Sequence, residues 1–172
     1  MSEFRPLKRK TWTSSRPKSP RLDTRSIARL HHTVAAVQGG RRASPEVEEA
    51  FWRVIRQGHL NLGKSDIAYS IGVCPSGRAY ILRGKRVGGH TCNHNSDSFA
   101  IVAAGNYEVK RVPRSLRTAI RQTLEWMVKR NWITRDFKWI PHSKTGVCDG
   151  ATACPGVRLR SIMDQLLPGA ET

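Results

Sequence analysis

The chain has 172 residues, which is enough for about one domain with a single core. Its 30 lysines and arginines outnumber 13 acidic residues, and the resulting net charge of +17 favours partners that are polyanions, such as nucleic acid, anionic polymers or anionic lipid. The proportions of hydrophobic (38%) and charged (25%) residues exclude a disordered protein, and the absence of a run of about 18 apolar residues argues against a transmembrane helix.

Residues 1–25 are predicted to form a flexible basic arm. They contain eight basic and two acidic residues, a net charge of +6, together with three prolines and several serines. They lack the apolar stretch of a secretory signal, so we expect the chain to be made in a (host) cytoplasm. Residues 26–172 are expected to form one domain, because no linker follows the arm.

Apolar periodicity predicts the order β, α, β, β, β, α, β, α along the chain. The expected elements are a strand at 26–32, a helix that begins at 44–46 and can end at Gly58, a hairpin of 67–73 and 78–82, a strand at 99–104, an amphipathic helix over 116–128, a short strand at 138–140 and a closing helix at 157–167. This order predicts an α/β fold in which a single mixed central β-sheet is flanked by helices.

Two histidines and one cysteine are candidate metal ligands. His31 ends a predicted strand, His142 follows another, and Cys154 precedes a predicted helix. Two imidazoles and a thiolate form a three-ligand zinc set that leaves the fourth position open for water, as a catalytic zinc requires. From residue types alone, surface or hydrogen-bonded histidines are the more common alternative. The four cysteines contain no Cys-x-x-Cys pair, and those outside this set are expected to be free thiols: Cys74, Cys92 and Cys148.

Six short elements follow one another between about residues 26 and 167: His31-His32-Thr33, Asp66-Ile67-Ala68-Tyr69-Ser70, Gly77-Arg78-Ala79-Tyr80, Gly89-His90-Thr91, Gly105-Asn106-Tyr107 and Thr152-Ala153-Cys154-Pro155-Gly156. The series resembles the type 2 N-acetylmuramoyl-L-alanine amidases and peptidoglycan recognition proteins, a family that includes phage endolysins. The resemblance implies the mixed-sheet fold and one zinc ion per chain. It also implies hydrolysis of the lactyl-L-alanine amide bond of bacterial peptidoglycan.

The resemblance also implies a role for particular residues. The zinc ligands would be His31, His142 and Cys154. Tyr69 would lie beside the metal and act in hydrolysis, and Thr152 would donate a hydrogen bond to the tetrahedral intermediate. Substrate-binding or supporting positions would be His90 and Asn106. Without the resemblance, Tyr69 would be interpreted as a packing residue on a strand face.

One departure from the family pattern is the separation of twelve residues between His142 and Cys154. It predicts an inserted turn around residues 146–150, where glycine and aspartate suit turns. The turn puts the presentation of Thr152 in question more than the three ligands.

The sequence leaves three functions open. The first is a phage-type endolysin that reaches the cell wall after membrane breach, held there or on a membrane surface by attraction of its basic arm to anionic wall polymers or lipid. The second is a non-catalytic peptidoglycan-binding module, against which the presence of Cys154 argues. The third is a nucleic-acid-binding protein, for which basic charge is the only support. No obligate protein partner is inferred.

Overall fold

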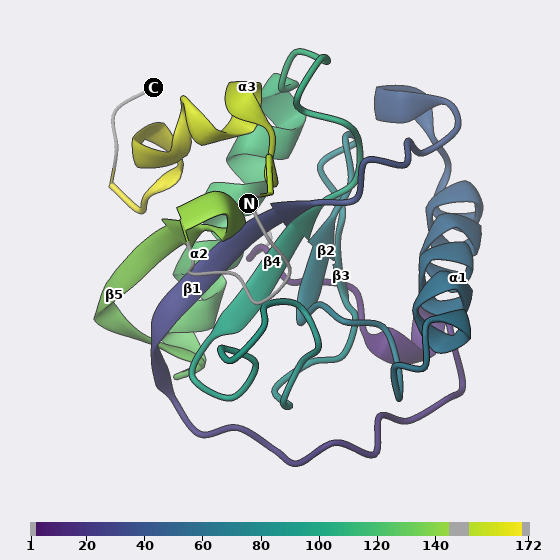
Figure 1. Cartoon of the computed structure of the whole chain (residues 1–172). Helices are drawn as coiled ribbons and strands as arrows, with labels where there is room; N and C mark the ends of the chain where they lie inside the picture. Colours follow the sequence, from purple (N-terminus) through teal and green to yellow (C-terminus); the bar gives the residue numbers. More distant parts are fainter. Residues whose placement is uncertain (1–2, 145–151, 170–172) are drawn as a thin grey trace.

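The computed structural model describes residues 3–144 and 152–169 and contains one five-stranded sheet (Figure 1). The strand order is β3-β2-β4-β1-β5, and all neighbours are parallel except the antiparallel hairpin of β2 and β3. The mixed sheet predicted from the sequence is therefore confirmed. The strands are β1 (Arg25–His32), β2 (Ile71–Val73), β3 (Ala79–Ile81), β4 (Phe99–Ala103) and β5 (Ile133–Pro141).

Within the described residues, three α-helices and four short 3-10 helices accompany the sheet. They are α1 (Pro45–Asn61), α2 (Arg114–Lys129), α3 (Val157–Arg160), η1 (Arg9–Thr11), η2 (Gly40–Arg42), η3 (His142–Lys144) and η4 (Met163–Leu166). None of the described helices is long and apolar enough to cross a lipid bilayer.

The start of α1 follows the sequence signal, whereas its end does not. The Ser44 side chain caps the helix by accepting a hydrogen bond from the N–H of Val47, and proline occupies the first turn. The helix continues through Gly58 to Asn61. The left-handed residue beyond its end is instead Gly63, with φ of +77°, whose N–H bonds to the carbonyl of Leu60.

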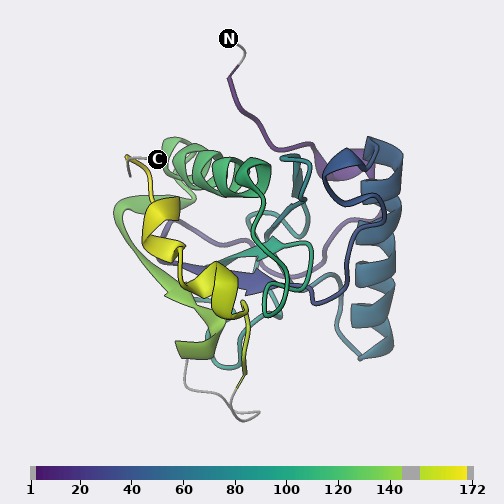
Figure 2. The same cartoon turned by 90° about the horizontal axis from the view of Figure 1, so that it is seen from above.

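One face of the sheet packs against α2, as the views in Figures 1 and 2 show. Buried residues of β1, β2 and β4 meet the apolar stripe of α2 on this face, and residues of α3 and η4 complete the cluster. The central strands are buried on both faces, as parallel strands covered on both sides require. This layer fixes β1 and β4, whose ends carry the site described below.

The other face has its own core, formed with α1. Trp52 of α1 is fully buried there and packs beside Tyr80, with ring centroids 6.4 Å apart. A side chain on Gly72 of β2 would place its Cβ 2.5 Å from the Trp52 ring. Glycine is therefore required at this position for the indole to lie against the strand.

Residues 3–24, which we term the N-terminal strap, are packed against both cores, with Trp12 in the cluster beside α1 and Leu22 in the cluster beside α2. The prediction of a flexible arm is wrong for this segment, because Trp12 and Leu22 are only 1% and 4% exposed. The N–H of Leu7 donates to the carbonyl of Ala79, and Leu7 in turn accepts from the N–H of Ile81, so the strap extends the edge of β3. Apolar residues too widely spaced to form a periodic pattern hold this segment in place.

Charged groups of the strap also have buried partners. The guanidinium of Arg9 lies 2.8 Å from the carboxylate of Asp66, which Arg56 of α1 also contacts at 2.7 Å. Burial alone would raise the pKa of Asp66, but the N–H of Ile67 and the two guanidinium groups lower the pKa below its ordinary value. Part of the basic charge therefore serves the fold and is not available to a partner.

Three other elements differ from their predicted bounds. The strand predicted at 67–73 begins only at Ile71. β5 begins at Ile133, five residues before the predicted start. The sequence pattern missed this first part because β5 pairs with β1 alone at the edge of the sheet, and its residues 134–138 are polar or partly exposed. The predicted closing helix is divided into α3 and η4, because N–H groups from Ile162 onward bond three residues back instead of four.

Candidate metal centre

Two parallel strands bring the two candidate histidine ligands together. Leu30 of β1 is paired with Pro141 of β5, so the residues that follow them, His31 and His142, emerge side by side. Their ring centroids are 4.5 Å apart. His31 is 1% exposed, whereas His142 is partly accessible. The register of β1 and β5 thus places one buried and one accessible imidazole together at the carboxyl ends of these two strands.

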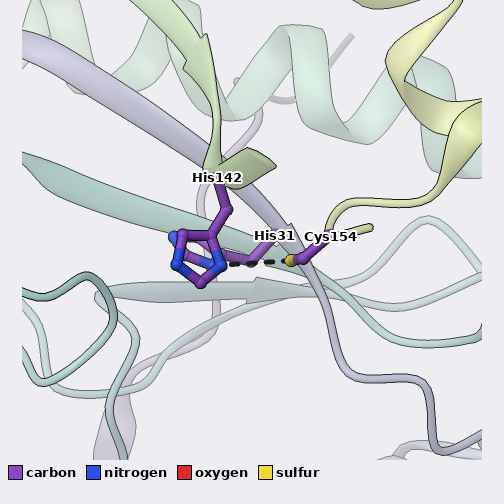
Figure 3. A group of neighbouring side chains, drawn as sticks. All are labelled: His31, His142 and Cys154. Atoms are coloured by element: carbon purple, nitrogen blue, oxygen red, sulfur yellow. Dashed lines mark hydrogen bonds between the residues drawn. The ribbon is translucent and has the colours of Figure 1, made fainter. Parts of the chain in front are cut away.

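Cys154 reaches these strand ends from the loop that precedes α3 (Figure 3). Its carbonyl accepts a hydrogen bond of 2.7 Å from the N–H of Ser143, which joins the loop to η3. Its Sγ accepts from the N–H of His32 at 3.4 Å and lies 3.7 Å from Nδ1 of His31. The cysteine is therefore tied both to the β1 end and to the turn that carries His142.

The same loop makes a close backbone contact with the segment after β4 at Gly156. A Cβ on Gly156 would lie 2.4 Å from the N of Glu108, and the residue has φ of +92°, where glycine is favoured. The N–H of Val157 then donates to the Glu108 carboxylate at 2.9 Å. Glycine at this position allows the loop to approach the segment after β4 and so sets the position of Cys154.

The donor set fits a zinc ion. One ligand atom from each of His31, His142 and Cys154 lies within 4.8 Å of the others. In a tetrahedral zinc site the usual bond lengths place a sulfur and a nitrogen donor about 3.6 Å apart, close to the 3.7 Å between Sγ of Cys154 and Nδ1 of His31. Imidazole nitrogen and thiolate sulfur are donors that zinc prefers, and a set of three protein ligands leaves the fourth position open, as catalytic zinc sites do.

The electrostatic environment keeps His31 and Cys154 neutral without a metal. Burial lowers the pKa of His31 well below its ordinary value, and His90, His142 and Arg29 lower it further. Burial raises the pKa of Cys154 to about 11, although the N–H of His32 partly opposes the shift. A neutral imidazole presents a lone pair directly, whereas the thiol must release its proton when a cation binds.

Tyr69 lies beside the candidate ligands, as the sequence implies. Its ring centroid is 5.3 Å from that of His31, and burial together with Cys154 raises its pKa above the ordinary value. Tyr69 is not on a strand, contrary to the simple packing interpretation, because β2 starts two residues later. His59 contacts its other side at 5.4 Å and accepts the N–H of Ala68 through Nδ1. The hydroxyl is therefore protonated, on a ring held from two sides.

His90 also lies near the centre, and it reaches His31 through a threonine. The ring centroids of His90 and His31 are 5.4 Å apart. Thr91 places its hydroxyl 3.0 Å from Nδ1 of His90 and 3.5 Å from Nε2 of His31. Such a contact to the second nitrogen of a ligand imidazole orients the ring. Thr91 lies in the Gly89-His90-Thr91 element, but nothing in the sequence indicates this contact.

Arg29 was missed as well, although a signal was available. Residues two apart on a strand share a face, so Arg29 lies on the same face of β1 as His31. It is 1% exposed, its Nε donates to Ser98 at 3.0 Å, and its guanidinium lies 3.9 Å from Asp97. A buried cation on this face lowers the pKa of both His31 and His90.

The remaining predicted site residues lie in the flanking loops. Thr152 is partly buried two residues before Cys154, and its Oγ1 accepts the Cys154 N–H at 3.2 Å. Asn106 lies in the loop after β4, where its side-chain oxygen accepts the N–H of Glu108 at 3.1 Å. The carboxamide of Asn106 therefore stabilises its own turn. The predicted turn at 146–150 lies outside the described residues.

One cysteine departs from expectation. Cys74 and Cys154 are free, but Cys92 is disulfide-bonded, so the prediction that it is a free thiol is wrong. That prediction rested on the cytoplasmic origin expected from residues 1–25 and not on any property of the residue itself. The free thiol predicted at Cys148 lies outside the described residues.

Comparison with known proteins identifies the family. Residues 24–157 match the family model described as N-acetylmuramoyl-L-alanine amidase, and the chain belongs to this family. The family predicted from the sequence elements is therefore confirmed. The match begins after most of the N-terminal strap.

Relatives and solved structures agree with this assignment. The chain is 33% identical over 101 residues to peptidoglycan-recognition protein LB of Drosophila melanogaster, and the aligned segment makes up 58% of this chain and 42% of the relative. It is 32% identical over 103 residues to N-acetylmuramoyl-L-alanine amidase of Homo sapiens, covering 59% and 17% respectively. A mutant of Drosophila recognition protein LB in complex with tracheal cytotoxin superposes with a TM-score of 0.78 at 25% identity and covers 91% of both chains. The matched part is thus about half or less of each curated relative.

Proposed function

We propose that the chain is a zinc-dependent N-acetylmuramoyl-L-alanine amidase that hydrolyses the lactyl-L-alanine amide bond of bacterial peptidoglycan. The observation that carries the proposal is the convergence of His31, His142 and Cys154, whose ligand atoms lie within 4.8 Å of one another, beside the Tyr69 ring. The family of the chain supports the reaction, and the tracheal cytotoxin complex of a structural neighbour supports a peptidoglycan fragment as ligand.

The three ligands would hold one zinc ion. When bound, zinc would supply a Lewis acid that polarises the amide carbonyl and lowers the pKa of a coordinated water. The contribution of the protein is to fix the donors before the metal arrives. The register of β1 and β5 positions His31 and His142, and the Ser143 to Cys154 hydrogen bond positions the thiol.

Tyr69 and Thr152 would stabilise the negative charge that develops on the amide oxygen. Because burial and Cys154 raise the pKa of Tyr69, its hydroxyl stays protonated at neutral pH and can donate a hydrogen bond. Thr152 uses its oxygen to accept the N–H of Cys154, which leaves its own O–H to donate. His59 would orient Tyr69, and Thr91 would orient the imidazole of His31.

The test combines metal content with peptide release from purified walls. The full-length protein should contain one zinc per chain and release stem peptides from the glycan. His31→Ala should lose both properties. The matched control is His94→Ala, which removes a partly exposed histidine that pairs with Asp97 and should change neither.

Two results would contradict the proposal. One is release of wall peptides by the zinc-free protein at the rate of the zinc-loaded protein. The other is tight binding to walls without any hydrolysis by the zinc-loaded protein, which would indicate a non-catalytic peptidoglycan-binding module.

A further inference from the structure

A second cavity lies beyond the ends of β1 and β4, outside the set of candidate ligands. It has a volume of about 150 Å³, and its floor includes Ala104 and Gly105, which directly follow β4. Arg41 of η2 lines the cavity, and so do Lys110 and Arg111 of the loop before α2. Figure 1 shows both segments beyond the tips of β1 and β4. Three basic side chains from two distant parts of the sequence thus meet at one cavity.

These three basic groups lack partners in the described part of the chain. Arg41, Lys110 and Arg111 are exposed, and across residues 3–144 and 152–169 their side chains form neither a hydrogen bond nor an ion pair. By contrast, Arg9 and Arg56 share a buried carboxylate. Like charges gathered at one cavity repel one another unless an anion neutralises them.

The surroundings add positive potential and no competing carboxylate. No acidic residue lines the cavity, and the neighbouring Glu108 already accepts the N–H of Val157. Pro113, which also lines the cavity, is the N-cap of α2, and this helix has neither a side-chain cap nor an acidic residue in its first turn. The positive end of the helix dipole therefore adds to the three side chains.

The cavity is connected to the candidate metal centre through two neighbouring residues of β1, His31 and His32. His31 pairs with Val102 of β4, and Ala104, two residues further along, lines the cavity. Nδ1 of His32, next to His31, accepts the N–H of Tyr107, which lines the cavity as well. A polymer bound at the centre could therefore place a neighbouring group in the cavity.

We propose that this cavity binds a phosphate group of a phosphodiester polymer attached to the bacterial wall, and so anchors the enzyme beside its scissile bond. Guanidinium groups pair with phosphate oxygens in a bidentate manner, and a lysine adds a point charge. Repeating phosphates on one polymer also suit a protein with a net charge of +17. The wall as the source of the phosphate rests on the proposed amidase function, whereas the phosphate site itself does not.

The test compares two triple variants that each lower the net charge by three. The cavity variant is Arg41→Gln/Lys110→Gln/Arg111→Gln. The control changes exposed strap residues that likewise have no side-chain partner among the described residues: Lys10→Gln/Arg16→Gln/Lys18→Gln. Equal thermal melting of both variants and the wild type would establish that the fold is intact.

The first measurement is calorimetric binding of poly(glycerol phosphate) at about 0.15 M salt, where charges more than about 8 Å from the ligand are screened. Because each exposed ionic contact contributes only modestly, loss of the three together should raise the Kd of the cavity variant about tenfold. The control should change by less than about twofold. Equal weakening of both variants would overturn the proposal in favour of diffuse attraction. So would tighter binding of DNA or of phosphatidylglycerol vesicles than of the polymer.

The second measurement is peptide release from intact walls and from walls stripped of phosphodiester polymers with hydrofluoric acid. The wild type should act faster on intact walls, and the cavity variant should lose that advantage while matching the wild type on stripped walls. Equal rates of the wild type on both walls would overturn the anchoring role. If the wild type released no peptide from either wall but bound the polymer through the cavity, the amidase proposal would fail and the phosphate site would stand.

Discussion

Trp12→Ala tests whether the N-terminal strap is part of the fold. The indole is 1% exposed, its Nε1 donates to the carbonyl of Ile81 at 2.9 Å, and the Arg9 guanidinium lies 4.8 Å from its ring centroid. Truncating a buried tryptophan to alanine costs about 3–5 kcal/mol of unfolding free energy. In a domain of this size each 1 kcal/mol corresponds to about 2–4 °C, so we expect the Tm to fall by about 6–20 °C.

The assay is urea unfolding followed by far-UV circular dichroism, with a thermal melt as a second measure. Zinc must be held at one concentration, because a ligand that binds only the native state shifts the apparent stability. Ser14→Ala is the control, since Ser14 is exposed and lies in the same segment; its effect should stay within about 0.5 kcal/mol. A loss of less than about 1 kcal/mol for Trp12→Ala would refute the packing of the strap and restore the flexible arm.

Four further variants test the site and the helices. Tyr69→Phe should keep zinc and stability but lose roughly 100- to 1000-fold in peptide release, and an unchanged rate would make Tyr69 a packing residue. Gly156→Ala should lose about 2–4 kcal/mol in urea unfolding and weaken zinc retention, because its Cβ would lie 2.4 Å from the backbone of Glu108; wild-type zinc retention would contradict the loop's role. Gly58→Ala, where the added Cβ meets open space inside α1, should instead gain about 0.5–1 kcal/mol, and a loss would indicate strain in that helix. Burial, and then Lys64, lower the pKa of His59 from 6.5 to about 4. As the pH falls, the unfolded chain therefore takes up a proton at this histidine before the folded chain does, and the free energy of unfolding decreases between about pH 6.5 and pH 4. His59→Gln should reduce that decrease by about 1 kcal/mol in urea unfolding, and parallel pH profiles of the variant and the wild type would contradict it.

The sequence predicts the sheet and helices well where one physical signal dominates. The apolar stripe of α2 and the capped start of α1 are strong local patterns. The strap escapes such reasoning because its burial depends on Trp12 and Leu22, which are isolated in a basic, proline-containing segment. The end of α1 was placed at Gly58 because a glycine inside a helix and a glycine after one look alike in sequence.

The candidate site divides in the same way. The residues of the resemblance, such as His31 and Cys154, are recognisable by their chemical type and order. The groups that act on them are harder to recognise: strand alternation places Arg29 on the face of His31, but the sequence does not show what either Arg29 or Thr91 contacts. Thr91 and Arg29 acquire their roles only when strand register brings them to His31. Asn106 is the reverse case: it belongs to one of the family-like sequence elements, but its side chain accepts a hydrogen bond within its own turn.

The long-range contacts of the strap also bear on how the chain folds during synthesis. Arg9 is separated from Asp66 by 57 residues, and Trp12 from Ile81 by 69. Because the strap is synthesised before the hairpin of β2 and β3, it has no partner until that hairpin has emerged, and its tryptophan meanwhile stays exposed to water and to chaperones. Contacts of such sequence separation close late and slow folding. The strap, although made before the sheet, would thus dock after the sheet and α1 have formed.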